Sequence, residues 1–339
     1  MNHEISILQR RLFEYILAKF EHAKDAIREL ETVLNISQSS VYKRIQGVKL
    51  VTSDEISVLI KRFSISPEVL FPLPKDRIIF DFLPLREESK ITGNYLSNVI
   101  QELEQVSANS DGKVTYLSTD LPFFYYFLHK EVAWFKLYLF EHNSSNKGIS
   151  QLPKLSFSAI GREQELVFES VKTLYSKINS EEIWTSRVFK ITVDQVKYFV
   201  EAKLFQYPEE ALLLLDKLAE TTDQLLEMIN KNNKGLIVNQ VTKGGTITLS
   251  YNDFNRFNPL IIASAKGMDN LYLTYDLPHY LYTTDIFFAK YTKEWIKRIK
   301  RKAFPLSANA DIEQVLFFNE KKQYILAEKE RIKQMLVKY

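Results

Sequence analysis

The chain has 339 residues, which corresponds to about two domains of ordinary size. Apolar residues make up 45% of it, charged residues 26%, and cysteine is absent, so the composition excludes extended disorder, disulfides and a cysteine nucleophile. The formal net charge is only +3, which means that any affinity for nucleic acid must come from a local basic surface.

The first seventy or so residues show a series of short amphipathic segments. Apolar residues recur at helical spacing from Ile5 to Phe20 and again from Ile27 to Leu34. Further helices are predicted after Ser37 and after Ser53, the latter with two acidic residues in its first turn, where they suit a helix N-terminus.

Four prolines follow this helical region. Pro67, Pro72, Pro74 and Pro84 fall within eighteen residues, and proline at this density breaks helices. We therefore predict a domain boundary near residue 75, with a first domain over residues 1–75 and a second over residues 76–339.

The second region is predicted to be mostly helical with one small β-sheet. Helical periodicity covers residues 95–106, 123–140, 163–177, 194–205, 208–230, 285–302 and 312–337. Short strands separated by turn residues are predicted at 246–250, 260–263 and 271–275. The predicted fold class is therefore mainly α.

Residues 30–47 have the pattern of a helix-turn-helix. The first helix presents Leu30 and Leu34 inward, and Ile36 fills the turn. Ser37 is placed to cap the second helix by accepting a hydrogen bond from a free backbone N–H. Val41 and its neighbour four residues later, Ile45, anchor the second helix to the core.

The other residues of the second helix suit DNA. Gln38 and Ser39 stand at the helix start, where short polar side chains reach base edges or phosphates, and glutamine can bridge adenine. Basic residues here contribute the salt-dependent, sequence-independent part of the affinity. The predicted DNA-binding residues are Ser37, Gln38, Ser39, Ser40, Tyr42, Lys43, Arg44, Gln46 and Lys49.

Residues 23–71 resemble the DNA-binding domain of the lambda-repressor/Cro-like (XRE-type) helix-turn-helix regulators. The resemblance rests on the Ser-Gln-Ser-Ser-Val-Tyr sequence from Ser37, on Gly47, and on the closing segment 63–70. It implies a five-helix fold, a recognition helix at about residues 38–46 in the major groove, and a homodimer on a palindromic operator. Many members carry an apolar anchor and then Glu where this chain has Arg44 and Ile45, a departure that rotates the expected reading face by part of a turn.

Residues 42–47, with Asp54-Glu-Ile56, also resemble a group of Bacteroidetes proteins. These proteins have an N-terminal helix-turn-helix and a long C-terminal region of unassigned role. The resemblance implies this architecture for most of the chain, and it implies no ligand.

Catalytic and metal-binding patterns are scarce. No Gly-rich phosphate loop, nucleophile elbow or His-Glu-x-x-His sequence is present, and the five histidines lack metal-ligand spacing. Asp120 and Asp276, each followed by Leu-Pro, form a candidate carboxylate pair, but turn formation and helix capping also explain aspartate there. We therefore expect a protein that is not an enzyme and has neither cofactor nor metal.

Two helices allow more than one role. The helix over 208–230 has the spacing of a core helix or of a short dimer seam. The basic run 293–302 suits a solvated face, or contact with the DNA backbone, an acidic partner or a membrane surface.

The predicted function is a sequence-specific DNA-binding transcription regulator whose residues 76–339 dimerise, sense an effector or recruit a partner. The alternative is a protein-interaction or signalling scaffold with a degenerate helix-turn-helix, which the low net charge favours. The first residues lack the order of a signal peptide, and no apolar run reaches the ~20 residues that span a bilayer. A cytoplasmic protein without a membrane partner is expected.

Overall fold

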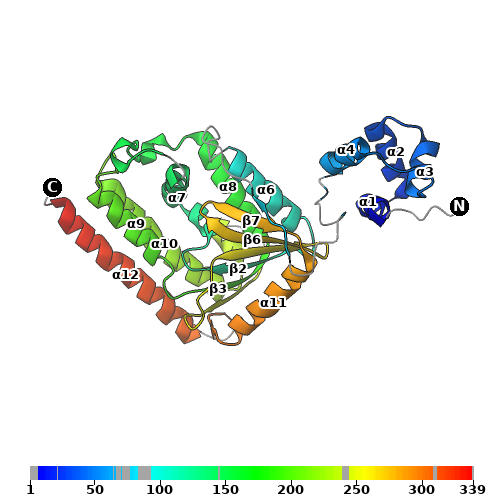
Figure 1. The fold of residues 1–339 in the computed structure, drawn as a ribbon. Coiled ribbons are helices and arrows are strands. Elements are labelled where there is room, and N and C mark those ends of the chain that lie inside the picture. Colours follow the sequence, from blue (N-terminus) through cyan, green and yellow to red (C-terminus); the bar gives the residue numbers. More distant parts are fainter. Residues whose placement is uncertain are drawn as a thin grey trace. The chain divides into compact units, whose positions relative to one another are not determined.

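The computed structural model divides the chain into two compact units, an N-terminal unit, Met1–Ile79, and a C-terminal unit, Phe80–Tyr339 (Figure 1). It describes residues 7–20, 22–63, 65, 70, 77–82, 93–143, 146–238, 244–307 and 311–337. The predicted boundary near residue 75 and the four prolines around it lie outside these residues.

Four helices of the N-terminal unit are described. They are α1 (Ile7–Ala18), α2 (Ala23–Leu34), α3 (Gln38–Ile45) and α4 (Ser53–Phe63). Each buries one apolar face, and these faces meet in a common core that contains Leu12, Leu30, Val41 and Leu59. The fifth helix that the family resemblance implies falls mostly on residues outside the described ranges.

An eight-stranded mixed sheet forms the centre of the described part of the C-terminal unit. Its strands are β1 (Asp81–Phe82), β2 (Lys113–Ser118), β3 (Asn179–Trp184), β4 (Ile247–Tyr251), β5 (Leu260–Ala265), β6 (Met268–Asp276), β7 (His279–Thr283) and β8 (Phe304–Pro305). They lie in the order β1-β7-β6-β5-β2-β3-β4-β8. The β2, β3 and β4 strands are parallel to one another, and all the other neighbours pair antiparallel.

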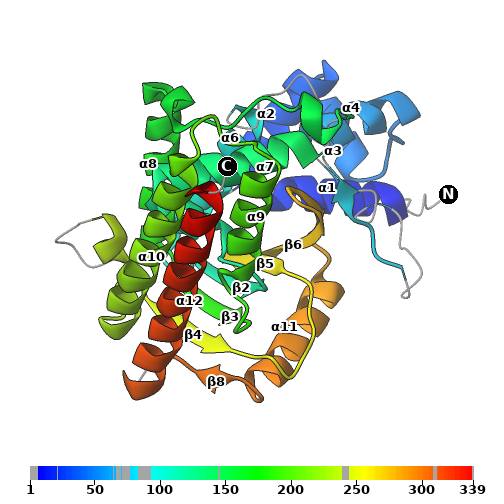
Figure 2. The same ribbon diagram turned by 90° about the vertical axis from the view of Figure 1, so that its left-hand side faces the viewer.

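Most of the described helices pack on one face of this sheet. They are α6 (Asn94–Ser107), α7 (Lys130–Asn143), α8 (Arg162–Lys177), α9 (Lys190–Glu201), α10 (Glu209–Asn230) and α12 (Asp311–Val337), together with the 3-10 helices η1 (Phe123–Leu128), η3 (Phe157–Ala159) and η4 (Lys234–Val238). A further 3-10 helix, η2 (Ile149–Gln151), is exposed. The α10 and α12 helices lie side by side (Figure 2), so α10 buries most of its apolar residues within the chain.

The opposite face carries α11 (Ile286–Lys300). Ile296 and Ile299 of α11 pack on Leu117 and Ile183, which alternate along β2 and β3 with residues that face the other helices. Figures 1 and 2 show α11 on the other side of the sheet from α10 and α12. The fold class is thus mainly α with one sheet, as predicted.

The three predicted strands correspond to β4, β5 and β6, whereas β1, β2, β3, β7 and β8 were not predicted. The polar sequence Asn-Ser-Glu-Glu at the start of β3 does not predict a buried strand, yet Glu182 is fully buried there. The predicted helix over 123–140 is also wrong in one respect, because η1 and α7 are separate helices that meet at His129.

Glu182 is buried because the chain surrounds its carboxylate with donors. The hydroxyls of Tyr125 and Tyr175 each donate to Oε1 at 2.7 Å, and the Ser180 hydroxyl donates to the same oxygen at 2.9 Å. The indole N–H of Trp184 donates to Oε2 at 2.9 Å. A buried carboxylate is tolerated only when it is paired in this way.

A buried lysine lies next to this cluster. Lys234 of η4 is fully buried, and its Nζ donates to the carbonyl of Ile178 at 2.9 Å and to the hydroxyl of Ser180 at 3.3 Å. The same Nζ stands 3.3 Å from the centre of the Tyr175 ring. Burial lowers the pKa of Lys234 to about 7, although the charge of Glu182 acts in the opposite direction.

This lysine makes stability depend on pH. Because its pKa is about 7 in the folded protein and 10.5 as its ordinary value, the unfolded chain binds more protons between these values. The free energy of unfolding of the C-terminal unit should therefore rise from pH 7 to pH 9, with a slope of up to about 1.4 kcal/mol per pH unit from this group. Lys234→Met, which keeps the volume, should remove that contribution.

The measurement is urea unfolding followed by tryptophan fluorescence, since all three tryptophans, Trp134, Trp184 and Trp295, belong to the C-terminal unit. The quantity to compare is the difference in slope between the wild type and Lys234→Met. Equal slopes in the two proteins would contradict the assignment of a neutral lysine at alkaline pH.

Candidate nucleic-acid interface

A three-residue turn joins α2 to α3. Asn35 ends α2 in the left-handed region, with φ of 51°, a conformation that asparagine tolerates better than most residues. The N–H of Ile36 bonds back to the carbonyl of Glu31 at 3.2 Å. Ser37 then has an extended backbone and starts α3, so the turn has the length that the sequence predicts.

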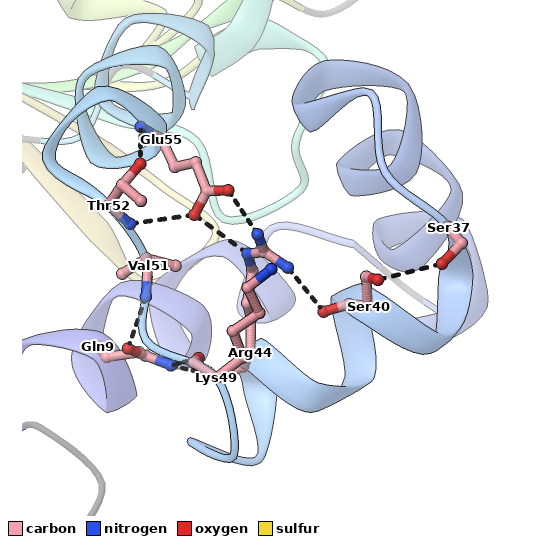
Figure 3. A network of polar contacts seen from close by, with 8 residues as sticks. All are labelled: Gln9, Ser37, Ser40, Arg44, Lys49, Val51, Thr52 and Glu55. Carbon is pink, nitrogen blue, oxygen red and sulfur yellow. Dashed lines mark hydrogen bonds and ion pairs between the residues drawn. The ribbon is translucent and has the colours of Figure 1, made fainter.

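Ser37 does not make the predicted cap. Its hydroxyl lies 3.2 Å from that of Ser39 and donates to that of Ser40 at 3.1 Å, and it accepts no hydrogen bond from the backbone (Figure 3). The hydroxyls of Ser39 and Ser40 bond to the Ser37 hydroxyl in place of the backbone, and the capping rule takes no account of such neighbours. The first turn of α3 therefore keeps backbone N–H groups without this partner.

The outward face of α3 carries most of the predicted DNA-binding residues. Of the predicted residues, Gln38, Ser39, Tyr42, Lys43, Gln46 and Lys49 are exposed, Ser37 is exposed at the cap and Ser40 is half-buried. Val48 and Leu50, in the segment after α3, are exposed as well. Tyr42 has 43% of its surface exposed. Residues four apart lie on the same side of a helix, so the exposed residues of α3 form one continuous face.

Arg44 is the exception among the predicted DNA-binding residues. It is only 3% exposed, and its Nε and Nη2 donate to the two carboxylate oxygens of Glu55 at 3.0 and 2.6 Å (Figure 3). Its Nη1 donates to the carbonyl of Ser40 at 3.2 Å. Arg44 comes three residues after the buried Val41, so helical phase turns it inward. The prediction of a DNA contact by Arg44 is therefore wrong.

Glu55 joins Arg44 to the start of α4. One Glu55 oxygen accepts the backbone N–H of Thr52 at 3.0 Å, and the Thr52 hydroxyl accepts the N–H of Glu55 at 3.2 Å. This reciprocal arrangement is a capping box. The hydrogen bond from Arg44 is the main cause that lowers the pKa of Glu55. The pair thus fixes the C-terminal half of α3 against α4.

Gln9 of α1 holds the segment that follows α3. Its Nε2 donates to the carbonyls of Arg44 and Lys49 at 2.6 and 2.9 Å, and its Oε1 accepts the N–H of Val51 at 3.1 Å. Gln9 is 1% exposed, and these bonds satisfy its amide. Neither the role of Gln9 nor the pairing of Glu55 with Arg44 was predicted from the sequence, although the spacing of Thr52 and Glu55 is itself a capping-box signal.

Asp120 and Asp276, the candidate carboxylate pair of the C-terminal unit, accept hydrogen bonds from different residues. Asp120 accepts hydrogen bonds from the buried Lys136 at 2.8 Å and from Thr192 at 3.0 Å. Asp276 lies exposed at the end of β6 and accepts one from Asn143. Among the described residues, no group of three or more histidines and carboxylates is arranged to hold a metal ion.

No protein-family profile, curated protein or solved structure matches this chain. Among the described helices, none combines the length and apolar character that crossing a bilayer requires.

The ion pair between Arg44 and Glu55 makes a stability prediction. Arg44→Ala leaves the partly buried carboxylate of Glu55 without its main partner, which should lower the free energy of unfolding of the N-terminal unit by about 2–3 kcal/mol. Hydrogen exchange with mass spectrometry on the full chain measures this as lost protection in peptides from α2, α3 and α4.

The control is Lys43→Ala, which removes one positive charge from the adjacent, exposed position of the same helix. It should change stability by less than about 0.5 kcal/mol. Equal exchange in the two variants would show that Arg44 does not hold α3 in place.

Proposed function

We propose that the protein is a sequence-specific DNA-binding transcription regulator and that α3 is its recognition helix. The observation that carries the proposal is the division of α3 into two faces. One face is held by the core, by Glu55 of α4 and by Gln9 of α1, while the other presents polar and basic side chains to solvent. A short helix fixed in this way can enter the major groove without reorganising.

The exposed side chains suit the two kinds of contact that DNA offers. Gln38 and Ser39 in the first turn are placed to meet base edges, where a glutamine amide pairs with adenine. Lys43 and Lys49 supply positive charge for phosphates, and no acidic residue lies between Ser37 and Lys49. The ring of Tyr42 adds an apolar surface and a terminal hydroxyl to the exposed face of α3.

The resemblance to the lambda-repressor/Cro-like regulators supports the same proposal. Such a regulator acts in the cytoplasm as a homodimer, with two half-sites about 34 Å apart along the duplex. The C-terminal unit then supplies dimer contacts, effector sensing or partner recruitment. Its α10 helix packs against α12 of the same chain, so a dimer seam would have to use other surfaces than the buried face of α10.

In vitro selection from random duplex DNA tests the proposal, and it should enrich one reproducible motif. Against that duplex, Lys43→Ala should weaken binding and reduce the slope of log K against log salt by about one, because one phosphate contact is lost. Gln38→Ala should relax the preference at one base pair by about 1–3 kcal/mol. Fluorescence anisotropy at several salt concentrations measures both effects.

Lys61→Ala serves as the matched control, since it removes an exposed lysine of the same unit from the far end of α4. It should leave the base preference unchanged. Failure to enrich any motif would contradict the proposal and favour the scaffold, in which the helix-turn-helix binds a protein.

A further inference from the structure

A large open cavity of the C-terminal unit lies where several strands of the sheet end. Its volume is about 1120 Å³, at the upper end of the range of small-molecule sites. Thr119 directly follows β2, Thr185 directly follows β3, and Asp253 comes just after β4, and all three line the cavity. Since these strands are parallel, the cavity is at their carboxyl ends, where open α/β sheets bind ligands.

The order of the strands also changes direction at this place. The chain adds β3 and β4 in turn on one side of β2, and then crosses to place β5 on the other side. The first residue of β5, Leu260, pairs with Leu117 near the end of β2 and lines the cavity. Where the strand order reverses in this way, the loops that follow neighbouring strands run in opposite directions, and a crevice opens between them.

Two arginines give the cavity a positive rim. Arg187 follows β3 and Arg256 follows β4, and both line the cavity and are exposed. Among the residues that the structure describes, neither guanidinium has an ion-pair or hydrogen-bond partner. The acidic Asp253 also lines the cavity, but its Oδ1 accepts the backbone N–H of Ser186 at 2.8 Å, which joins the loops after β3 and β4.

The start of α9 adds to this positive character. Ile191 in its first turn lines the cavity, and the N-terminus of a helix attracts anions through its free N–H groups. The preceding residue, Phe189, is fully buried and has φ of 74°, which is costly for a residue with a side chain. The fold therefore holds the loop between β3 and α9 in a strained conformation at the rim.

One helix contributes an aromatic surface to the cavity. Phe288, Tyr291 and Trp295 of α11 line the cavity, and Tyr291 has 59% of its surface exposed. Aromatic side chains in a cavity provide flat surfaces on which a planar ring stacks. Charge for an anion and a flat wall for a ring thus occur in the same cavity.

We propose that this cavity binds a nucleotide, with its phosphates at Arg187 and Arg256 and its base against Tyr291 and Trp295. Guanidinium groups pair with phosphate oxygens in a bidentate manner, and hydroxyls such as that of Ser186 suit the ribose. The proposal concerns the C-terminal unit alone and does not rest on DNA binding by α3.

Isothermal titration of the full chain, without DNA, tests it. The probes are ATP, GTP, CTP and UTP, with adenosine, guanosine, cytidine, uridine and inorganic phosphate as separate arms. At least one triphosphate should bind, and its nucleoside and inorganic phosphate should each bind at least about tenfold more weakly. Binding should also change the tryptophan fluorescence, and Trp295→Phe should abolish that change because Trp134 and Trp184 do not line the cavity.

Arg187→Gln and Arg256→Gln should each weaken nucleotide binding by about tenfold or more. Both residues are exposed, so the fold should survive, and the unchanged thermal transition of each variant checks this. The matched control is Arg162→Gln, an exposed arginine of α8 that does not line the cavity.

Three results would overturn the proposal. The first is that no triphosphate binds at millimolar concentration. The second is that the double variant Arg187→Gln/Arg256→Gln binds like the wild type. The third is that inorganic phosphate or a nucleoside binds as tightly as its nucleotide. Equal binding of phosphate would show that the base makes no contact, and equal binding of a nucleoside would show that the phosphates make none. None of these results bears on the DNA selection experiment.

Discussion

The ion pair between Arg44 and Glu55 decides how the candidate recognition helix is held. Arg44 lies on the buried side of α3, as Val41 does. Its burial is tolerated because both carboxylate oxygens of Glu55 accept hydrogen bonds from its guanidinium. Such a pair adds little net stability compared with apolar residues, but breaking one half of it is costly. Its geometry also demands one orientation, so α3 and α4 have a defined angle and register. The outward face of α3 depends on that orientation.

The C-terminal unit uses a buried carboxylate in a similar way. Glu182 stands in β3 at the centre of the sheet, and the donors that satisfy it come from η1, α8 and β3 itself. A fully satisfied polar network in a low-dielectric core permits few alternative packings. The same strand leads directly into Thr185 and Arg187 at the rim of the cavity. The network therefore positions the segment on which the proposed nucleotide site depends.

Part of the exposed face of α3 could be predicted from the sequence. Helical phase placed Gln38, Tyr42 and Lys43 together on one face of α3, and the same rule, applied to Arg44, would have turned it inward. The predicted DNA contact of Arg44 rested on its charge alone and not on its position around the helix. The cavity could not be located from the sequence, because the lining residues follow strands far apart in the chain, and two of these strands, β2 and β3, were not predicted.

The sequence was sufficient to predict most of the helices, since the spacing of apolar residues along a helix is a local property that does not need the rest of the chain. It also determined the three-residue turn between α2 and α3 and the polar, basic character of the α3 surface. Which charged side chains are buried became visible in the folded structure alone. Arg44 needs Glu55, Glu182 needs donors from Tyr125 and Tyr175, and whether a polar side chain lies inside depends on partners that the fold brings from elsewhere.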